Sequence, residues 1–392
     1  MGFLKRLTAI CFVVAVAMPA FGAQIRVLSA TVDNKRINDA HVIWQREGEA
    51  DQQTATNASG KAPLSTLADD KNTTLTIEKL GYARLVMPCP CSGLTYALSP
   101  IMNDLNQVRV VLTWAGEPRD LDAHLRMFGE HIYFGHRKDV SARLDVDNYN
   151  YFGPETITFK SGLLGQRYVY AVNDKTNWHK LTSYALSNSK AKVQVYVGQT
   201  LIRTYEVKPN KNALSWVVFA IDEDGNFHDI NQYLLLNGED LSKHMTSLVG
   251  SGSFKNQEFA SPATIKKAKW FNELGEERYH ESHPKHLEQA MYLFIDAVNL
   301  YPDYGQAYSN LGLTYQKLHR TAEALWANRK AIALAHGKSR AITQASSYYN
   351  IARIYEDKGM LQPALEAYQK ANTLRPRAAY EKAIKRLKAQ LD

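Results

Sequence analysis

The sequence predicts a multidomain chain in which two all-β sandwich domains are followed by an all-α solenoid of repeats. Three observations predict this order. The 392 residues exceed the length of one ordinary domain. Up to about residue 240, short runs of β-branched and aromatic residues alternate with turn residues. Beyond about residue 262, small and large apolar residues recur at helical spacing in several copies.

Residues 1–23 have the composition of a secretory signal peptide. Lys5 and Arg6 precede an apolar run that ends at Met18, and small residues follow up to Ala23. The apolar run is shorter than the ~18 residues that a membrane span requires, and no later stretch reaches that length. We therefore expect an exported mature chain, periplasmic or secreted, without a transmembrane segment.

Residues 24–101 read as short strands separated by turns. The run from Thr54 to Ala62, with Gly81-Tyr82 about twenty residues later, resembles the carboxypeptidase regulatory-like domain. That resemblance implies a small β-sandwich that is accessory and carries no catalytic residues. Cys89 and Cys91 flank Pro90 within it. The sequence leaves open a local disulfide, two thiols, a redox or soft-metal site, and an intermolecular bridge.

Residues 102–240 contain seven strand candidates between turn residues, which suggests a second β-sandwich. The candidates are 108–114, 131–134, 156–159, 168–172, 192–196, 201–207 and 215–221. Residues 241–262 are rich in Ser, Gly, Lys and Asn, so we expect a linker there. Residues 263–392 are helical in character.

An acidic segment in the second β region is the strongest candidate site. Its side chains are Asp120, Asp122, His124, Asp145, Asp147 and Glu155. Asp-x-Asp-x-His alternates with apolar residues, so the three polar side chains share one face of a strand. Crowded carboxylates repel each other unless a cation or an arginine compensates.

Three interpretations of this segment remain open. It holds a divalent cation, with calcium favoured because hard cations bind several carboxylate oxygens at close range. His124 counts against a pure calcium site because calcium prefers oxygen, unless His124 instead donates to one of the carboxylates. Alternatively, the aspartates cap strand ends through hydrogen bonds to the backbone. A third interpretation is a hydrolytic site with an Asp or Glu as general base and His124 assisting.

The motifs LTW, DLDxH, LDxD and GPET around these residues resemble the YfaP-like family of exported bacterial proteins. The resemblance spans about 130 residues and implies no activity. It does imply that the motifs belong to one site.

Two weaker candidates accompany the acidic segment. His280, His283 and His286 have a spacing that suits zinc or copper on a helix, but Pro284 interrupts the helix and favours an exposed loop. Aromatic residues near the acidic segment fit either carbohydrate stacking or ordinary packing. They are Tyr149, Tyr151, Phe152, Trp178 and Tyr184.

Residues 263–392 contain an internal repeat that resembles the tetratricopeptide repeat. Leu311-Gly312, Ala324 and Ala331 recur as Ile351-Ala352, Ala364 and Ala371, and Leu274-Gly275 begins an earlier copy. The resemblance implies that a protein or peptide binds along a concave face. We expect the partner to contact Tyr308, Asn310, Tyr315, Tyr348, Asn350 and Tyr355.

The net charge of +8 lies mostly in this helical part. It favours either acidic partners or simply a solvated surface, and nucleic acid is not expected for an exported protein. No nucleophile motif or phosphate-binding loop occurs, so we predict no catalytic residues. We expect a non-enzymatic scaffold with a cation or ligand site in the central β-domain. A cell-envelope hydrolase and a carbohydrate-binding protein are the alternatives.

Overall fold

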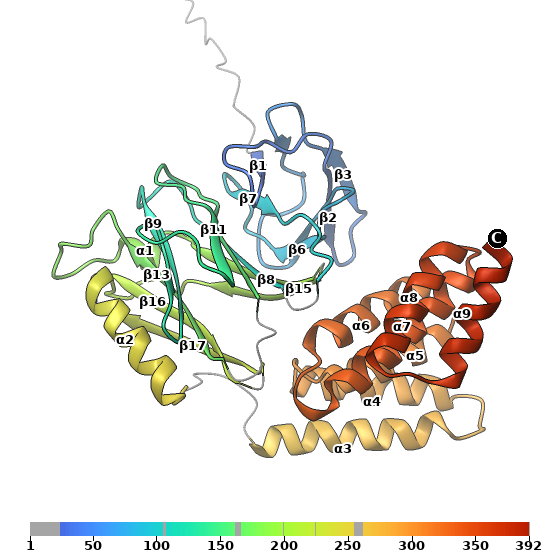
Figure 1. Cartoon of the computed structure of the whole chain (residues 1–392). Helices are drawn as coiled ribbons and strands as arrows, with labels where there is room; N and C mark the ends of the chain where they lie inside the picture. Colours follow the sequence, from blue (N-terminus) through green and yellow to red (C-terminus); the bar gives the residue numbers. More distant parts are fainter. Residues whose placement is uncertain are drawn as a thin grey trace, which may run out of the picture.

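The computed structural model of the chain describes residues 24–104, 107–160, 166–198, 200–223, 225–254 and 262–391. β-strands fill the first part and helices the last, which confirms the predicted order of β regions followed by a helical region (Figure 1). The signal peptide predicted for residues 1–23 lies outside the described residues.

The first β region forms two small sheets that share one hydrophobic core. Its strands are β1 (Gln24–Ser29), β2 (His41–Arg46), β3 (Gln52–Ala55), β4 (Lys61–Pro63), β5 (Thr73–Glu78), β6 (Leu85–Pro88) and β7 (Thr95–Leu98). The sheet orders are β4-β1-β7 and β3-β2-β5-β6. In β2, Val42 and Trp44 are buried and alternate with less buried neighbours, so the period of two places the apolar side chains on the core.

The second β region forms two five-stranded sheets. Its strands are β8 (Gln107–Thr113), β9 (Leu121–Met127), β10 (His131–Ile132), β11 (Ala142–Val146), β12 (Glu155–Lys160), β13 (Tyr168–Asp174), β14 (Lys192–Val197), β15 (Thr200–Glu206), β16 (Ser215–Ile221) and β17 (Phe227–Leu234). The orders are β10-β9-β13-β16-β17 and β11-β12-β8-β14-β15. Both sheets contribute to one core, with Trp216 and Phe219 fully buried. A short helix, α1 (Ala185–Asn188), precedes β14.

The predicted linker at 241–262 is wrong for its first half, because helix α2 (Gly238–Ser251) occupies it. The side chain of Asn237 caps the helix by accepting from the backbone N–H groups of Glu239 and Asp240. Leu241, Met245 and Val249 recur at helical spacing and pack on the outer face of the sheet that contains β9, β13 and β16. Residues 255–261 lie outside the described part.

The helical region is an array of antiparallel pairs. Its helices are α3 (Pro262–Tyr279), α4 (His286–Leu300), α5 (Gly305–Lys317), α6 (Thr321–Leu334), α7 (Arg340–Asp357), α8 (Leu361–Leu374) and α9 (Ala378–Leu391), with a 3₁₀ turn, η1 (Gly337–Ser339), before α7. α3 packs with α4, α5 with α6, and α7 with α8, while α9 packs on α8 (Figure 1). The first helices of the pairs, α3, α5 and α7, lie next to one another.

The array is docked on the second β region through α6 and β15. Arg203 of β15 forms ion pairs with Asp303, between α4 and α5, and with Asp229 of β17 at 3.4 Å. Lys330 of α6 donates to the carbonyl oxygen of Leu201 at 3.0 Å. These contacts hold the β-domain against α6, the second helix of its pair, and against the turn between α4 and α5.

Candidate functional site

The candidate site lies where the edge of β9 meets the ends of β11 and β12. β10 is only two residues long and pairs with Leu125 and Arg126, so it leaves the earlier part of β9 without a partner on that side. At this place the Oε2 atom of Glu155, the first residue of β12, accepts the backbone N–H of Ala123 at 2.9 Å. The carboxylate of Glu155 thus accepts the backbone N–H of β9 that a carbonyl group of a neighbouring strand would otherwise accept.

Three of the six predicted ligands converge there. Asp122, Asp147 and Glu155 each offer a carboxylate oxygen within 4.8 Å of the others. Asp122 is 3% exposed and Glu155 is 1% exposed. Among the described residues, Asp122 Oδ2 and Glu155 Oε1 have no hydrogen-bond partner.

The site is electrostatically unfavourable for three bare carboxylates. Burial, reinforced by the charges of Asp120 and Asp147, raises the pKa of Asp122 to about 8. Burial and the charge of Asp122 raise the pKa of Glu155 well above its usual range. The pKa of Asp120 is raised by burial and by Asp147. Arg137 partly offsets this charge, because its Nη1 lies 3.5 Å from Asp147 Oδ2.

Asp145 does not join the three carboxylates. The pairing of β11 with β12 shifts register at Asp145, and its carboxylate accepts from Arg143 at 2.5 Å and from the hydroxyl of Thr158. Arg109 lies 4.0 Å away. Asp145 is therefore part of a hydrogen-bonded arginine cluster.

His124 also has other partners. Its Nδ1 lies 3.0 Å from Nε2 of His131, and Nδ1 of His131 lies 3.2 Å from Oγ of Ser242 on α2. The Nε2 atom of His124 has no partner among the described residues. Burial and the neighbouring imidazole lower the pKa of His124 to about 3, so the ring is neutral.

This histidine chain lines a cavity of about 300 Å³ between the sheet and the start of α2. Phe134 and Trp178 form part of its wall, and the ammonium of Lys175 lies 4.4 and 4.8 Å from their ring centroids. Of the aromatic residues predicted to stack on carbohydrate, Trp178 lines the cavity. Carbohydrate binding stays a prediction.

Sequence reasoning missed His131, Lys175 and Ser242 as residues of this region. The only signal for His131 was its place at the start of a predicted strand. Ser242 was not predicted as a site residue because the segment around it has the composition of a linker.

The predicted partner-binding residues differ in accessibility. Tyr308 and Tyr315 are buried between paired helices. Tyr348 and Tyr355 line a cavity between α6, α7 and α8, and Asn350 donates to Asn328. These placements do not test partner binding.

Asn310 belongs to a polar cluster on the first helices of the repeats. Glu276 Oε1 accepts from the amides of Asn272 at 2.9 Å, Asn310 at 2.7 Å and Gln306 at 3.2 Å. Asn310 also donates to Asn272 Oδ1 at 3.0 Å. The cluster joins α3 to α5, and only Asn310 of its members was predicted as a contact residue.

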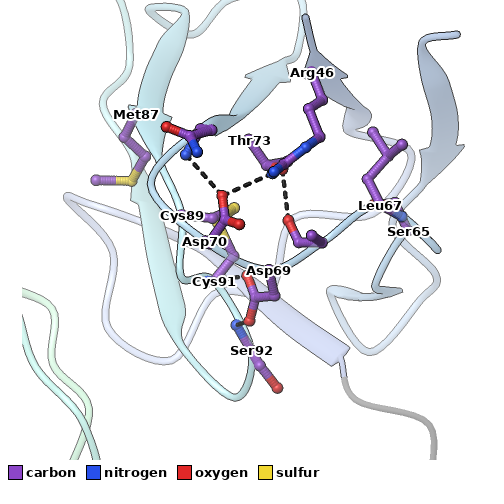
Figure 2. Close-up of a disulfide and its surroundings, with 12 residues drawn as sticks. Arg46, Ser65, Leu67, Asp69, Asp70, Thr73, Met87, Cys89, Cys91 and Ser92 are labelled. Carbon is purple, nitrogen blue, oxygen red and sulfur yellow. Dashed lines mark hydrogen bonds and ion pairs between the residues drawn. A yellow bond between two sulfur atoms is a disulfide. The ribbon is translucent and has the colours of Figure 1, made fainter. Parts of the chain in front are cut away.

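Cys89 and Cys91 form a disulfide, the first of the alternatives left open by the sequence (Figure 2). Asp69 holds the segment by accepting the backbone N–H of Cys91 at 2.6 Å and of Ser92 at 3.0 Å. The two sulfurs are bonded to each other, so they are not free to hold a soft metal.

The predicted histidine cluster does not assemble as a metal site in the described part of the chain. His280 and His283 lie between α3 and α4, and His286 begins α4. His283 pairs with Glu281 at 2.9 Å, and His286 Nδ1 lies 3.1 Å from the carbonyl oxygen of Tyr279.

Comparison with known proteins identifies one tetratricopeptide repeat in the helical region. Residues 345–378 match the sequence profile of the tetratricopeptide repeat family. A search of curated proteins gave no match.

Solved structures similar to the chain include three that each match about a third of it. The TPR domain of Arabidopsis OM64 is 18% identical with a TM-score of 0.29, and the match covers 32% of this chain and 98% of that chain. The N-terminal domain of stress-induced protein 1 from C. elegans is 20% identical with a TM-score of 0.29, and the match covers 33% of this chain and 99% of that chain. The first TPR of Spaghetti (RPAP3), bound to the HSP90 peptide SRMEEVD, is 17% identical with a TM-score of 0.29, and the match covers 32% of this chain and 94% of that chain.

Among the described residues, no helix has both the length and the apolar character needed to cross a membrane. The matched repeat lies within α7 and α8 and extends to the start of α9. The C-terminal part of the chain thus contains a tetratricopeptide repeat, a module typical of protein–protein interaction scaffolds.

Proposed function

We propose that this chain is an exported, non-enzymatic scaffold that binds an extended segment of a partner protein along α3, α5 and α7. Its central β-domain supplies a separate cation or ligand site. The proposal rests on the observation that the two faces of the helical array have different surroundings. The β-domain contacts α6, whereas the polar cluster on α3 and α5 lies on the first helices of the repeats.

The cluster around Glu276 supports an extended peptide as the partner. The amide nitrogens of Asn310 and Gln306 already donate within the cluster, so Asn310 through Oδ1 and Gln306 through Oε1 can accept from a peptide backbone irrespective of the peptide's side chains. Their bonds to Glu276 hold them in place before binding, which lowers the entropy lost on association. Rigid helices present these groups at fixed spacing, as in other grooves that bind peptides.

Two further observations support export. Residues 1–23 have the composition of a signal peptide. The Cys89–Cys91 disulfide is compatible with an oxidising compartment.

The test uses the full chain expressed with its own leader and recovered from the exported fraction. Chemical cross-linking in that compartment, followed by mass spectrometry, should identify a partner segment attached beside α3 and α5. Asn310→Ala should weaken binding of that segment at least about fivefold, because it removes an amide that is held in place. Gln362→Ala is the matched control, since Gln362 is an amide on α8, outside the cluster.

Three results would contradict the proposal. Full-length protein with an intact leader in the cytosol would contradict export. Cross-links confined to the second helices of the pairs, α4, α6 and α8, would contradict the proposed groove, and so would equal binding by the Asn310 and Gln362 variants.

A further inference from the structure

We propose that Asp122, Asp147 and Glu155 hold one hard divalent cation, of the calcium type, which ties the open edge of β9 to β11 and β12. This deepens the cation or ligand site of the central domain in the function proposed above. It does not depend on whether the repeats bind a partner.

The three carboxylates come from separate segments that meet only in the folded protein. Asp122 lies on β9, Asp147 follows β11, and Glu155 begins β12. Their nearest oxygens lie within 4.8 Å of one another. Ca²⁺–oxygen bonds measure about 2.3–2.6 Å, so oxygens on opposite sides of one ion lie about 5 Å apart. A single ion can therefore contact all three carboxylates with small movements of the side chains.

The unpartnered oxygens provide an independent observation. Glu155 is 1% exposed and Asp122 is 3% exposed, and each has a buried oxygen without a hydrogen-bond partner in the described part of the chain. A buried polar atom that bonds neither to protein nor to water is costly, and a buried charge more so. The other oxygen of Glu155 is already occupied by the N–H of Ala123. The free oxygen is thus held in position while lacking a partner.

Basic side chains do not supply that partner. Within the described residues, neither Asp122 nor Glu155 forms an ion pair with Lys, Arg or His, and Arg137 reaches only Asp147. The ammonium of Lys175 lies against the rings of Phe134 and Trp178. The site is then neutralised either by protons on Asp122 and Glu155, whose pKa values are raised, or by a bound cation, and the metal titration described below distinguishes the two.

The donor set selects the class of ion. All three donors are carboxylate oxygens, which suit hard cations, whereas zinc and copper favour nitrogen and sulfur. In the described part of the chain, the group of ligand atoms that lie within 4.8 Å of one another contains these three carboxylates and no histidine nitrogen. Calcium tolerates irregular geometry and 6–8 oxygens, and water or backbone oxygens would provide the rest. Magnesium demands a stricter octahedron, which side chains from three separate segments provide less readily.

The position indicates what the ion does. β10 does not cover β9 at Ala123, and the side chain of Glu155 connects the two sheets there. A cation bound to Asp122, Asp147 and Glu155 adds a second connection at the same edge. We therefore expect the ion to raise the stability of the central β-domain.

The experiment uses the exported full chain, stripped with EDTA and dialysed. Calcium, magnesium and zinc salts are titrated separately while thermal unfolding and heat of binding are recorded. We expect one calcium ion per chain and a saturable rise in Tm that EDTA reverses. Glu155→Gln keeps an acceptor for the N–H of Ala123 but removes the charge, and it should weaken calcium binding by about tenfold or more.

Asp147→Asn provides a second variant at a position after the end of β11, where misfolding is a smaller risk. It should weaken calcium binding in the same way. Asp145→Asn is the control, since Asp145 lies two residues away and bonds to Arg143 and Thr158 instead. It should keep the calcium response even if its starting Tm is lower.

Several outcomes would overturn the proposal. They are no stoichiometric calcium binding by the folded wild type, an unchanged response in both Glu155→Gln and Asp147→Asn, and loss of the response in Asp145→Asn. A larger response to zinc or magnesium would overturn the calcium assignment. Capture of a partner by the repeats is measured on the same variants, so a failure of the cation site is distinguished from a failure of the scaffold.

Discussion

Asp145 and Asp147 are separated by one residue, yet their carboxylates have different partners. Asp147 lies with Asp122 and Glu155, whereas Asp145 accepts from Arg143 and Thr158 and lies near Arg109. The register shift in β11 at Asp145 breaks the alternation that would have placed both side chains together. At the scale of the residue, the backbone irregularity decides which aspartate enters the site.

Asp145→Asn should destabilise the protein by about 1–3 kcal/mol. The change removes the charge that faces Arg143 and the buried Arg109 and leaves two guanidinium groups near each other. Urea unfolding measures the loss. Glu239→Gln is the matched control, because Glu239 pairs with Lys243 at an exposed site and such pairs contribute at most ~1 kcal/mol. Equal changes in the two variants would contradict a structural role for Asp145.

At the scale of the element, paired helices of the repeats approach closely where the sequence places small residues. A Cβ atom at Gly312 of α5 would lie 2.3 Å from Nδ2 and 2.6 Å from Cγ of Asn328 on α6. Asn328 is fully buried, donates to Ala324 and accepts from Asn350. The side chain of Asn328 therefore cannot move away without breaking hydrogen bonds.

Gly312→Ala should destabilise the helical array by about 1–3 kcal/mol, because overpacking outweighs the better helix propensity of alanine. Gly250→Ala on α2 is the matched change, since a Cβ there meets nothing within 4 Å. It should stabilise the protein by up to ~1 kcal/mol. Thermal unfolding followed by circular dichroism measures both. Destabilisation of the same size in both variants would contradict the packing argument.

At the scale of the whole molecule, the docking of the helical array on the β-domain partly buries the side chain of Lys330. Lys330 donates to Leu201 O, and burial lowers its pKa to about 8, with a further contribution from Arg203 and an opposing one from Asp303. The unfolded chain keeps this proton up to about pH 10.5. Between about pH 8 and 10.5 the unfolded state thus binds more protons than the folded state, so stability due to Lys330 rises with pH in that window.

Lys330→Met removes this pH dependence. Relative to the variant, the wild type should gain up to about 3 kcal/mol in free energy of unfolding from pH 8 to pH 10.5 and show a constant difference below pH 8. Urea unfolding at several pH values, followed by the helical signal at 222 nm, measures the difference. Parallel curves across the whole window would show that Lys330 is not buried by docking.

The sequence by itself determined the order of the regions and the chemistry available to the candidate site. Strand and helix periodicity follow from local backbone geometry, so short β-rich runs and the recurring Leu-Gly and Ala positions predicted β regions followed by tetratricopeptide repeats. The acidic residues were visible for the same reason, because their identities and spacing are local. The segment that forms α2 was mistaken for a linker, since its stability comes from the sheet beneath Leu241 and Met245 rather than from its composition.

Only the tertiary structure decided which of these residues meet. The facing edges of two sheets bring Asp122 and Glu155 together. A register shift at Asp145, which the spacing of residues in the sequence does not reveal, separates its carboxylate from theirs. His131 and Ser242 come together because α2 packs across the sheet. Each of these contacts depends on pairing and packing between segments far apart in the chain, whereas sequence patterns report mainly on the local backbone.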